Sequence, residues 1–426
     1  MENFANPVRP RASKSKISEL YPYYAGFSPE FASDAARWLA PSKNDIILDP
    51  WNGAGTTTSL AKEFIISTIG YDLNPVMVLV SKANLIVPHE ASSIPPLTEK
   101  ISKSLETQRK ATSNNPLTLL FTEGTASTIR AIAVGIWEHL VSSEASESST
   151  KHINTASPLA AVFFVGIFNT ARELLSSFGT SNPTWMKIPK TEHEKINVSA
   201  QEVTLHFKNA MTRIQNLIAD KCLNSPTPIA SCNYGDSKKL PLDDESIDAV
   251  LTSPPYCTRL DYARATMVEL LILESLNLAS YQHTRISLMG SSVVNKPVHT
   301  NIPSEWGQSC KSLLEKIYEH PSKASKTYYF NSHYNYFKDL YQSISEIGRV
   351  CKPSARVCIV AQDSYYKELH NDLPEIIMEM ASHQRFETHS VFPYEKKNPI
   401  SLINSASSTY RNKKTPIETA ILLTRS

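Results

Sequence analysis

The pattern of hydrophobic and polar residues along the chain predicts an α/β protein. Short apolar runs over 45–48 and 65–71 are typical of buried strands, and the segment 56–64 between them has helical spacing. A further helix is expected before the first strand, over 28–40. A strand, a glycine-containing turn, a helix and a second strand in this order begin a parallel sheet.

A long, mostly helical stretch then interrupts the α/β pattern. Residues 90–230 are rich in Ser, Thr, Glu, Lys and Ala, and we predict four helices there, over 97–112, 126–143, 157–176 and 199–220. Afterwards the pattern predicts strands over 247–251, 355–361 and 418–423, and helices over 262–278 and 332–350. The segment 282–330 is polar and irregular, and we expect it to form a second excursion from the sheet.

Composition limits the classes of protein without selecting one. The 426 residues are 41% hydrophobic and 20% charged, and the formal net charge of +2 is too small to indicate nucleic-acid binding by itself. The six cysteines include no C-x-x-C pair and no zinc-ligand spacing, so we expect reduced thiols and no metal. The N-terminus lacks the apolar segment of a signal peptide, and the longest apolar stretch, 159–168, is too short to span a bilayer. We therefore expect a cytoplasmic protein with no membrane partner. Residues 1–18 are basic and polar, and we expect them to form a flexible arm.

A glycine-rich turn follows the first predicted strand. Its sequence is DPWNGAGTT, residues 49–57. Gly53 and Gly55 allow a tight turn and a close approach of the backbone to a ligand, and the next helix directs its free N–H groups at the same place. Thr58 stands where the dinucleotide fingerprint requires a third glycine, and no GK[ST] follows. Neither a dinucleotide site nor a P-loop therefore fits this turn.

Two acidic residues stand at the ends of the first two predicted strands. Asp49 suits a positively charged part of a ligand, such as an ammonium group. Asp72 follows 23 residues later, where dinucleotide-binding folds place a carboxylate on a ribose. Each acid could instead cap a helix or face solvent in a loop. Their position beside the glycines favours a ligand site.

A second motif, Ser253-Pro254-Pro255-Tyr256, directly follows the strand that resumes the sheet. The prolines have no N–H, so they stiffen the turn and leave the carbonyls of Ser253 and Pro254 free to accept hydrogen bonds. A planar amino group needs such acceptors together with a flat partner. Tyr256 offers a ring on which a base can stack. The alternative interpretation is a proline-rich turn with a tyrosine in the core.

Together these motifs resemble those of the amino-methyltransferase family of DNA methylases, the N4-cytosine and N6-adenine enzymes. DPWNGAGTT is similar to the family's cofactor motif, usually D-P-F-x-G-S-G-T-T, and SPPY is similar to its catalytic motif. The segment YPYYAGFSPE, residues 21–30, is similar to one that places a phenylalanine against the cofactor. The resemblance implies a Rossmann-like methyltransferase sheet with helices on both faces, built from 19–89 and 231–426. It also implies a large, mostly helical insertion over 90–230, and S-adenosylmethionine as the cofactor.

The resemblance also assigns roles to individual residues. Asp72 would hold the cofactor ribose, and Asp236, in the segment GDS, would lie near the adenine amino group. The implied cofactor-binding residues are Phe27, Asp49, Trp51, Gly53, Gly55, Thr56, Thr57, Asp72 and Asp236. The implied catalytic residues are Ser253, Pro254, Pro255 and Tyr256. The cofactor motif precedes SPPY here, which departs from the family's common order.

The implied reaction is direct methyl transfer to the exocyclic amino group of a base flipped out of double-stranded DNA. The Ser253 side chain and the Pro254 carbonyl would accept the amino hydrogens. Serine at the first position of SPPY favours cytosine N4 over adenine N6, because the adenine enzymes of the family more often carry Asp or Asn there. A C5-cytosine enzyme would need a Pro-Cys pair, whereas Cys257 follows Tyr256.

Target recognition is expected in the 90–230 insertion, the largest addition to the fold. Arg172 and the segment 181–185, which ends in Trp185, combine a cation, amides and an aromatic ring that suit contacts with a base; a buried loop with a core tryptophan is equally compatible. Arg259 and Arg264 would meet phosphates beside the flipped base. Further basic residues that suit DNA lie towards the two ends: Arg9, Arg11, Lys14, Lys16, Lys396, Lys397, Arg411, Lys413 and Lys414.

Two other functions keep the same motifs. The first is an amino-methyltransferase acting on tRNA or rRNA, although we find no recognisable RNA-binding appendage. The second is a catalytically silent subunit that binds nucleic acid, against which the complete motifs argue. A DNA methyltransferase would in turn imply cognate restriction or defence proteins in a restriction-modification system as partners.

Overall fold

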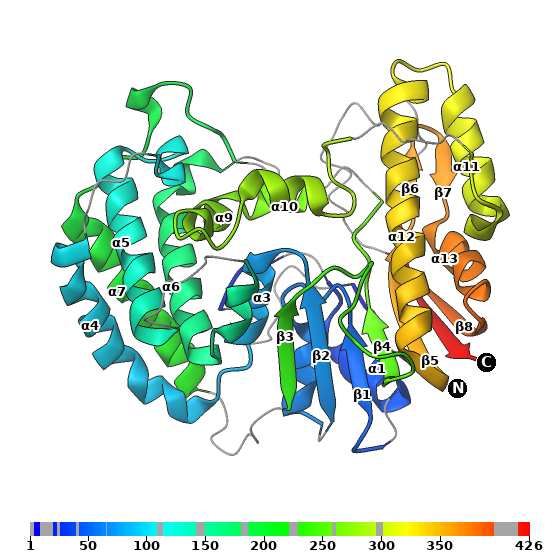
Figure 1. Ribbon diagram of the computed structural model, residues 1–426, viewed down its shortest axis with the longest axis horizontal. Helices are drawn as coiled ribbons and strands as arrows, with labels where there is room; N and C mark the ends of the chain where they lie inside the picture. Colours follow the sequence, from blue (N-terminus) through cyan, green and yellow to red (C-terminus); the bar gives the residue numbers. More distant parts are fainter. Residues whose placement is uncertain are drawn as a thin grey trace.

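A seven-stranded sheet with the strand order β3-β2-β1-β4-β5-β9-β8 forms the centre of the protein (Figure 1). In the computed structural model the described residues are 4–8, 20–23, 26–39, 42–64, 66–108, 114–141, 150–179, 186–220, 229–257, 261–294, 301–395 and 416–426. The strands are β1 Ile46–Asp49, β2 Ser67–Asp72, β3 Ala230–Tyr234, β4 Ile247–Thr252, β5 Cys351–Gln362, β8 Phe386–Glu395 and β9 Ile417–Arg425. The first five pair in parallel, whereas β9 is antiparallel to both of its neighbours. A separate hairpin consists of β6 Ser364–Tyr366 and β7 Leu369–Asn371.

Helices cover both faces of the sheet, as the resemblance implied. Alternate residues of a strand point to opposite faces. Ile47 of β1 and Leu251 of β4 accordingly pack with α1, whereas their neighbours Leu48 and Val250 pack with α12. The helices of these layers are α1 Pro29–Leu39 on one face, and α11 Gly307–Glu319, α12 Phe330–Val350 and α13 Leu373–Ser382 on the other.

Between β2 and β3 the chain forms a helical layer beside the sheet (Figure 1). Its long helices are α4 Ile94–Gln108, α5 Glu123–Leu140, α6 Pro158–Leu174 and α7 Ala200–Ala219. The apolar run that begins α6 is buried on every side, since every residue from Ala160 to Phe168 is buried. α6 contacts both α3 Pro75–Ala83 and α9 Met267–Glu274, so it joins the layer to the rest of the fold. The short helices are α2 Thr56–Ser59, α8 Tyr262–Ala265 and α10 Tyr281–Ser287, and Figure 1 shows α10 above the sheet.

The structure differs from the sequence-based expectation in 282–330. This segment is not irregular, because it contains α11, and α10 overlaps its start. The buried residues of α11 are Cys310, Leu313, Leu314 and Ile317, a narrow apolar stripe at helical spacing in an otherwise polar helix. Such a stripe is easily overlooked, because polar residues outnumber the apolar ones along the helix. The strands β3 and β8 were also not expected, since both are edge strands with few buried residues.

The N-terminal residues that the structure describes are packed, contrary to the expected flexible arm over 1–18. Phe4 is buried and its ring lies against Phe31 of α1 and Phe392 of β8. The backbone N–H of Ala5 donates to Asp34 at 2.9 Å. Phe4 therefore belongs to the core on the α1 face, and Ala5 packs against that core, while residues 1–3 and 9–19 lie outside the described ranges.

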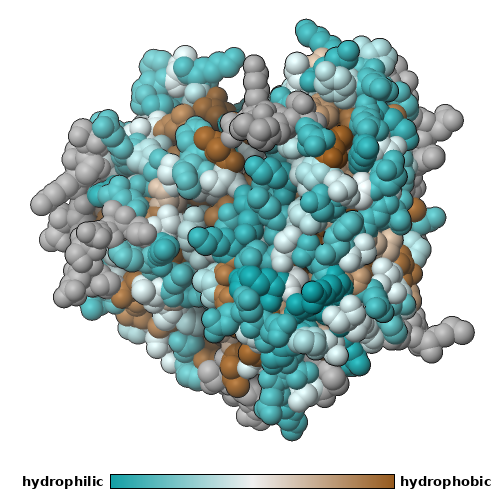
Figure 2. All heavy atoms as spheres, turned by 45° about the vertical axis from the view of Figure 1, so that its right-hand side comes forward, coloured by the Kyte–Doolittle hydropathy of each residue, from teal (hydrophilic) through white to brown (hydrophobic). Residues whose placement is uncertain are grey.

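The described surface carries few large apolar side chains. On the face drawn in Figure 2, hydrophobic residues form separate patches between hydrophilic ones and no continuous band. None of the helices in the described ranges is long and apolar enough to cross a membrane.

Replacing Phe4 with alanine is expected to lower the free energy of unfolding by about 2–4 kcal/mol, because the ring fills a buried position. Equilibrium unfolding in urea would measure the change. Leu205→Ala, at an exposed position of α7, is the control and should change the value by less than about 0.5 kcal/mol. An unchanged stability of the Phe4 variant would restore the interpretation of this segment as a free arm.

Candidate functional site

A cavity lies where the carboxyl ends of β1, β2 and β4 meet, and it encloses about 1000 Å³ of space free of protein atoms, including the part open to solvent. After β1 the chain adds β2 and β3 on one side, whereas β4 lies on the other side of β1. Ligands of parallel α/β sheets bind at such a switch point. The predicted residues that line the cavity are Phe27, Asp49, Trp51, Gly53, Thr56, Asp72, Asp236, Ser253, Pro254, Pro255 and Tyr256.

Gly53 and Gly55 shape the loop after β1 in different ways. Both have a positive φ, +50° and +83°, which favours glycine. Gly53 lines the cavity. Gly55 does not line the cavity. A Cβ at this position would lie 2.8 Å from the Cβ of Ser81 in α3. Gly55 is therefore required for packing of the loop against α3, whereas the sequence suggested an approach to a ligand.

Asp49 is the hub that joins the two motifs. Its Oδ1 accepts hydrogen bonds from Thr252 Oγ1 at 2.6 Å and from the N–H of Trp51 at 3.1 Å, and its Oδ2 accepts one from Thr57 Oγ1 at 2.7 Å. Thr57 also lies behind the loop, where its hydroxyl is 3.1 Å from the carbonyl of Leu251. Burial raises the pKa of Asp49 to about 6, and these donors oppose the rise. The carboxyl group thus binds the end of β1, α2 and the end of β4 together.

Asp72 organises the neighbouring loop in a similar way. Its Oδ2 accepts the N–H of Gly53 at 2.9 Å, and its Oδ1 accepts the N–H of Asn74 at 2.7 Å. Burial raises the pKa of Asp72 to about 6. Each carboxylate oxygen has a second lone pair, so the side chain can still accept hydrogen bonds from a ligand in the cavity.

Asp236 lines the cavity from the turn after β3. Its Oδ1 accepts the N–H of Lys238 at 3.0 Å, and the Lys238 ammonium group lies 3.7 Å from Oδ2. The same ammonium group is 3.4 Å from Asp339 of α12. Lys238 also lines the cavity, so this end of it carries both signs of charge.

The SPPY segment uses some of its polar groups for structure and leaves others open. The carbonyl of Pro255 accepts the hydroxyl of Tyr336 at 2.7 Å, and the N–H of Tyr256 donates to the hydroxyl of Tyr262 at 3.1 Å. Within the described part of the chain, the Ser253 hydroxyl and the Pro254 carbonyl have no hydrogen-bond partner, and both residues line the cavity. The resemblance to the amino-methyltransferases implied these two acceptors, whereas the motif alone predicted the carbonyls of Ser253 and Pro254.

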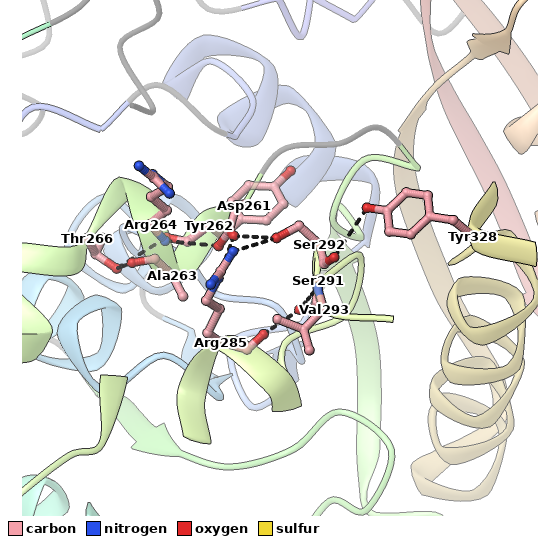
Figure 3. A network of polar contacts seen from close by, with 10 residues as sticks. All are labelled: Asp261, Tyr262, Ala263, Arg264, Thr266, Arg285, Ser291, Ser292, Val293 and Tyr328. Atoms are coloured by element: carbon pink, nitrogen blue, oxygen red, sulfur yellow. Dashed lines mark hydrogen bonds and ion pairs between the residues drawn. The ribbon is translucent and has the colours of Figure 1, made fainter. Parts of the chain in front are cut away.

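A buried carboxylate holds the segment around Tyr262 (Figure 3). Asp261, which is 4% exposed, caps α8 by accepting the N–H of Arg264 at 3.0 Å. Its other oxygen accepts Arg285 Nε at 2.8 Å and Ser292 Oγ at 2.7 Å. The network joins α8, α10 and the loop after it, and thereby keeps Tyr262 against the cavity.

Of the three candidate substrate-binding residues, the structure describes Arg264 alone. Arg264 lies on α8 and does not line the cavity. Figure 3 shows its side chain pointing away from the Asp261–Arg285 pair. Arg259 and Trp185 lie outside the described residues.

The prediction that Arg172 contacts a base does not agree with the structure. Its guanidinium group pairs with the fully buried Glu269 of α9 and donates to the Tyr21 hydroxyl at 2.8 Å and to the carbonyl of Ala265 at 2.7 Å. The side chain is committed to joining α6 to α9, so it cannot read a base edge.

Several residues of the cavity wall were not predicted as site residues, among them Asn52, Asn74, Lys238 and Tyr262. Asn52 lies within DPWNGAGTT, and Asn74 lies two residues after Asp72, so their position was a usable signal. Tyr262 gave no signal, because no local pattern indicates that its hydroxyl accepts the N–H of Tyr256, six residues earlier.

Gly55→Ala is expected to lower the free energy of unfolding by about 2–5 kcal/mol, from the positive φ and the clash with Ser81. Gly53→Ala should cost only about 1–2 kcal/mol, since its nearest side-chain contact, Tyr23 Cε1, would be at 3.6 Å. Urea unfolding of both variants would measure the difference. Equal losses would contradict the packing role of Gly55.

Thr252→Val keeps the shape of the side chain and removes the donor to Asp49. We expect a loss of about 1–3 kcal/mol of unfolding free energy, because a buried carboxyl loses a partner. Thr212→Val, on the exposed side of α7, removes a hydroxyl of the same kind and is the matched control. Similar stabilities of the two variants in urea would show that Asp49 does not depend on Thr252.

Comparison with known proteins agrees with this geometry. Residues 247–419 match the family model of the N6/N4 methyltransferase type, described as DNA methylase. The match begins at the first residue of β4, so it includes the SPPY segment.

Two curated relatives cover most of the chain. The type II methyltransferase M.BsoBI of Geobacillus stearothermophilus is 23% identical over 391 residues, which are 81% of this chain and 73% of that protein. The type II methyltransferase M.MvaI of Kocuria varians is 20% identical over 418 residues, 93% of this chain and 87% of that protein.

A solved S-adenosylmethionine-dependent methyltransferase from Methanosarcina mazei is 9% identical and covers 90% of this chain and 93% of its own, but its TM-score of 0.30 is too low to support a conclusion. The family match and the two curated relatives agree with the SPPY motif and the glycine-rich loop at one cavity. On this basis residues 247–419 are a DNA methylase domain of the N6/N4 methyltransferase type, for which S-adenosylmethionine is the cofactor.

Proposed function

We propose that the protein transfers a methyl group from S-adenosylmethionine to the exocyclic amino group of a base in double-stranded DNA. The observation that carries this proposal is the pair of open acceptors, the Ser253 hydroxyl and the Pro254 carbonyl, on the wall of the cavity that the glycine-rich loop also lines. Both motifs meet there because Thr252 donates to Asp49.

The cavity has the donor and acceptor set that the cofactor needs. Asp72 retains acceptor capacity for ribose hydroxyls, and Asp236 can accept from an adenine amino group. Phe27 and Trp51 provide apolar wall. Three of the four lone pairs of the Asp49 carboxylate accept hydrogen bonds from the protein, so its main role is to hold the loop in place. The fourth lone pair is available to a positively charged group of the ligand.

When bound, S-adenosylmethionine supplies an electrophilic methyl group on a positively charged sulfur. The chain's part is to position the acceptor. A base amino group is a weak nucleophile because its lone pair is delocalised into the ring. Hydrogen bonds to Ser253 and Pro254 orient its hydrogens and favour a pyramidal nitrogen, while the ring of Tyr256 supports the base from one face. The target must leave the helical stack to reach this place.

Cytosine N4 is the proposed target in preference to adenine N6. The support is the serine at the first position of SPPY, which in this family is the more usual residue of the cytosine enzymes. We propose further that the helical layer over 90–230 contributes to target recognition, and that Arg259, Arg264 and Trp185 contact the DNA.

The test is transfer of tritiated methyl groups from S-adenosylmethionine to unmethylated double-stranded DNA, with RNA in parallel and digestion to nucleosides afterwards. We expect label in N4-methylcytosine. Label in N6-methyladenine would keep the mechanism and reverse the base. Label in RNA alone would favour the RNA enzyme, and cofactor binding without any transfer would favour the silent subunit.

Ser253→Ala is expected to lower kcat by about ten- to a hundredfold, because one acceptor for the amino group is lost. The Kd for S-adenosylmethionine, measured by calorimetry, should stay within about twofold, since the hydroxyl faces the acceptor base. Thr212→Ala serves as the control for loss of a hydroxyl far from the cavity. A Ser253 variant with full kcat would exclude this hydroxyl from the reaction.

A further inference from the structure

The hydroxyl of Tyr256 is held by a residue from the far end of the chain. It donates to Oε1 of Glu418 at 3.0 Å, across 162 positions of sequence. Glu418 is the second residue of β9 and is 2% exposed. The N–H of Tyr256 meanwhile donates to Tyr262. The ring that faces the cavity is therefore fixed at its backbone and at its hydroxyl.

Glu418 places an uncompensated acid in the core. Its Oε2 is buried without a hydrogen-bond partner, and no ion pair links Glu418 to a cation among the residues that the structure describes. The nearby acid Asp363 differs, because it accepts the N–H of Ile417 at 2.8 Å and lies 2.9 Å from His370 Nε2. A buried carboxylate with one unmet oxygen is costly, and an amide would accept the tyrosine hydroxyl equally well. The charge itself is therefore the feature that needs an explanation.

Burial, and after it the charge of Glu418, raises the pKa of Tyr256 well above its ordinary value. The phenol thus keeps its proton and always has a hydrogen to donate. A hydrogen bond to a carboxylate shifts electron density towards the ring. The ring face, which already carries negative charge, becomes a better neighbour for a cation.

The proposed methyl transfer moves positive charge to that neighbour. The amino nitrogen forms a bond to the methyl carbon as the sulfur–carbon bond breaks and leaves its electron pair on sulfur. The nitrogen is then positively charged until it releases a proton to water. A negative charge behind the ring on which the base rests stabilises the positively charged nitrogen more than the neutral amino group. The interaction is strong when water is excluded from the site.

We propose that Glu418 is a positioning residue that acts through Tyr256: it holds the ring and sets a negative charge behind it, which stabilises the cation forming on the base. This inference rests on the proposed function. It assigns to the last strand a part in the reaction that neither motif indicates.

Glu418→Gln keeps an acceptor oxygen and removes the charge. We expect kcat for methyl transfer to DNA to fall about tenfold, while the KM for DNA and the Kd for S-adenosylmethionine stay within about twofold. Glu202→Gln, at an exposed position of α7, is the matched control. A merely structural role would instead lower the midpoint of unfolding and weaken cofactor binding.

Glu418→Asp is the second variant and keeps the charge on a shorter side chain. It should retain more activity than Glu418→Gln; the reverse order would reduce Glu418 to a hydrogen-bond acceptor and overturn the role of its charge. A Gln variant with the kcat of the wild type overturns the inference and leaves the proposed function intact. A wild-type protein that transfers no label to DNA overturns both.

Discussion

The site depends on one buried carboxyl group. Asp49 receives hydrogen bonds from the loop that follows β1, from α2 and from Thr252 at the end of β4. Thr252, the most distant of these donors, lies 203 positions from Asp49 in the chain. Because Thr252 immediately precedes Ser253, the position of the SPPY segment is set relative to the glycine-rich loop by this single group. A polar hub of this kind is stable only when its lone pairs are satisfied, and three of them are.

The same principle separates structural from chemical groups in the SPPY segment. Groups that face the protein are paired: the Pro255 carbonyl with Tyr336, and the Tyr256 N–H with Tyr262. The groups that face the cavity, on Ser253 and Pro254, are left for a ligand. The prolines make this arrangement possible without an unpaired donor, because they have no N–H that would need a hydrogen-bond partner. The antiparallel strand β9 then supplies Glu418 from behind, which a wholly parallel sheet of this length would not bring there.

Much of the parallel sheet could be predicted because its strands are short, apolar and followed by distinctive turns. DIIL, IDAVL and ARVCIVA all lie in strands of the sheet, and the four long helices between β2 and β3 lie close to their expected ranges. The edge strands β3 and β8 and helix α11 escaped prediction, because each buries only a few residues. Phe4 escaped for a related reason: a single aromatic residue in a polar segment has no periodicity, and only its packing against α1 and β8 shows why it is buried.

The sequence by itself determined the two motifs, and with them the resemblance to the amino-methyltransferases and the cofactor that it implies, since the spacing of glycine, acid and proline is a local property of the chain. Eleven of the predicted site residues line the cavity, but most of the lining residues were not predicted. The tertiary structure alone decided that Gly55 packs against α3 and that Arg172 pairs with Glu269. It also decided that Tyr262 and Glu418 accept hydrogen bonds from Tyr256. Tyr262 lies only six positions from Tyr256, but the other outcomes depend on strand order and on contacts between residues far apart in sequence. No local pattern encodes such contacts, because the residues involved become neighbours only when the sheet has formed.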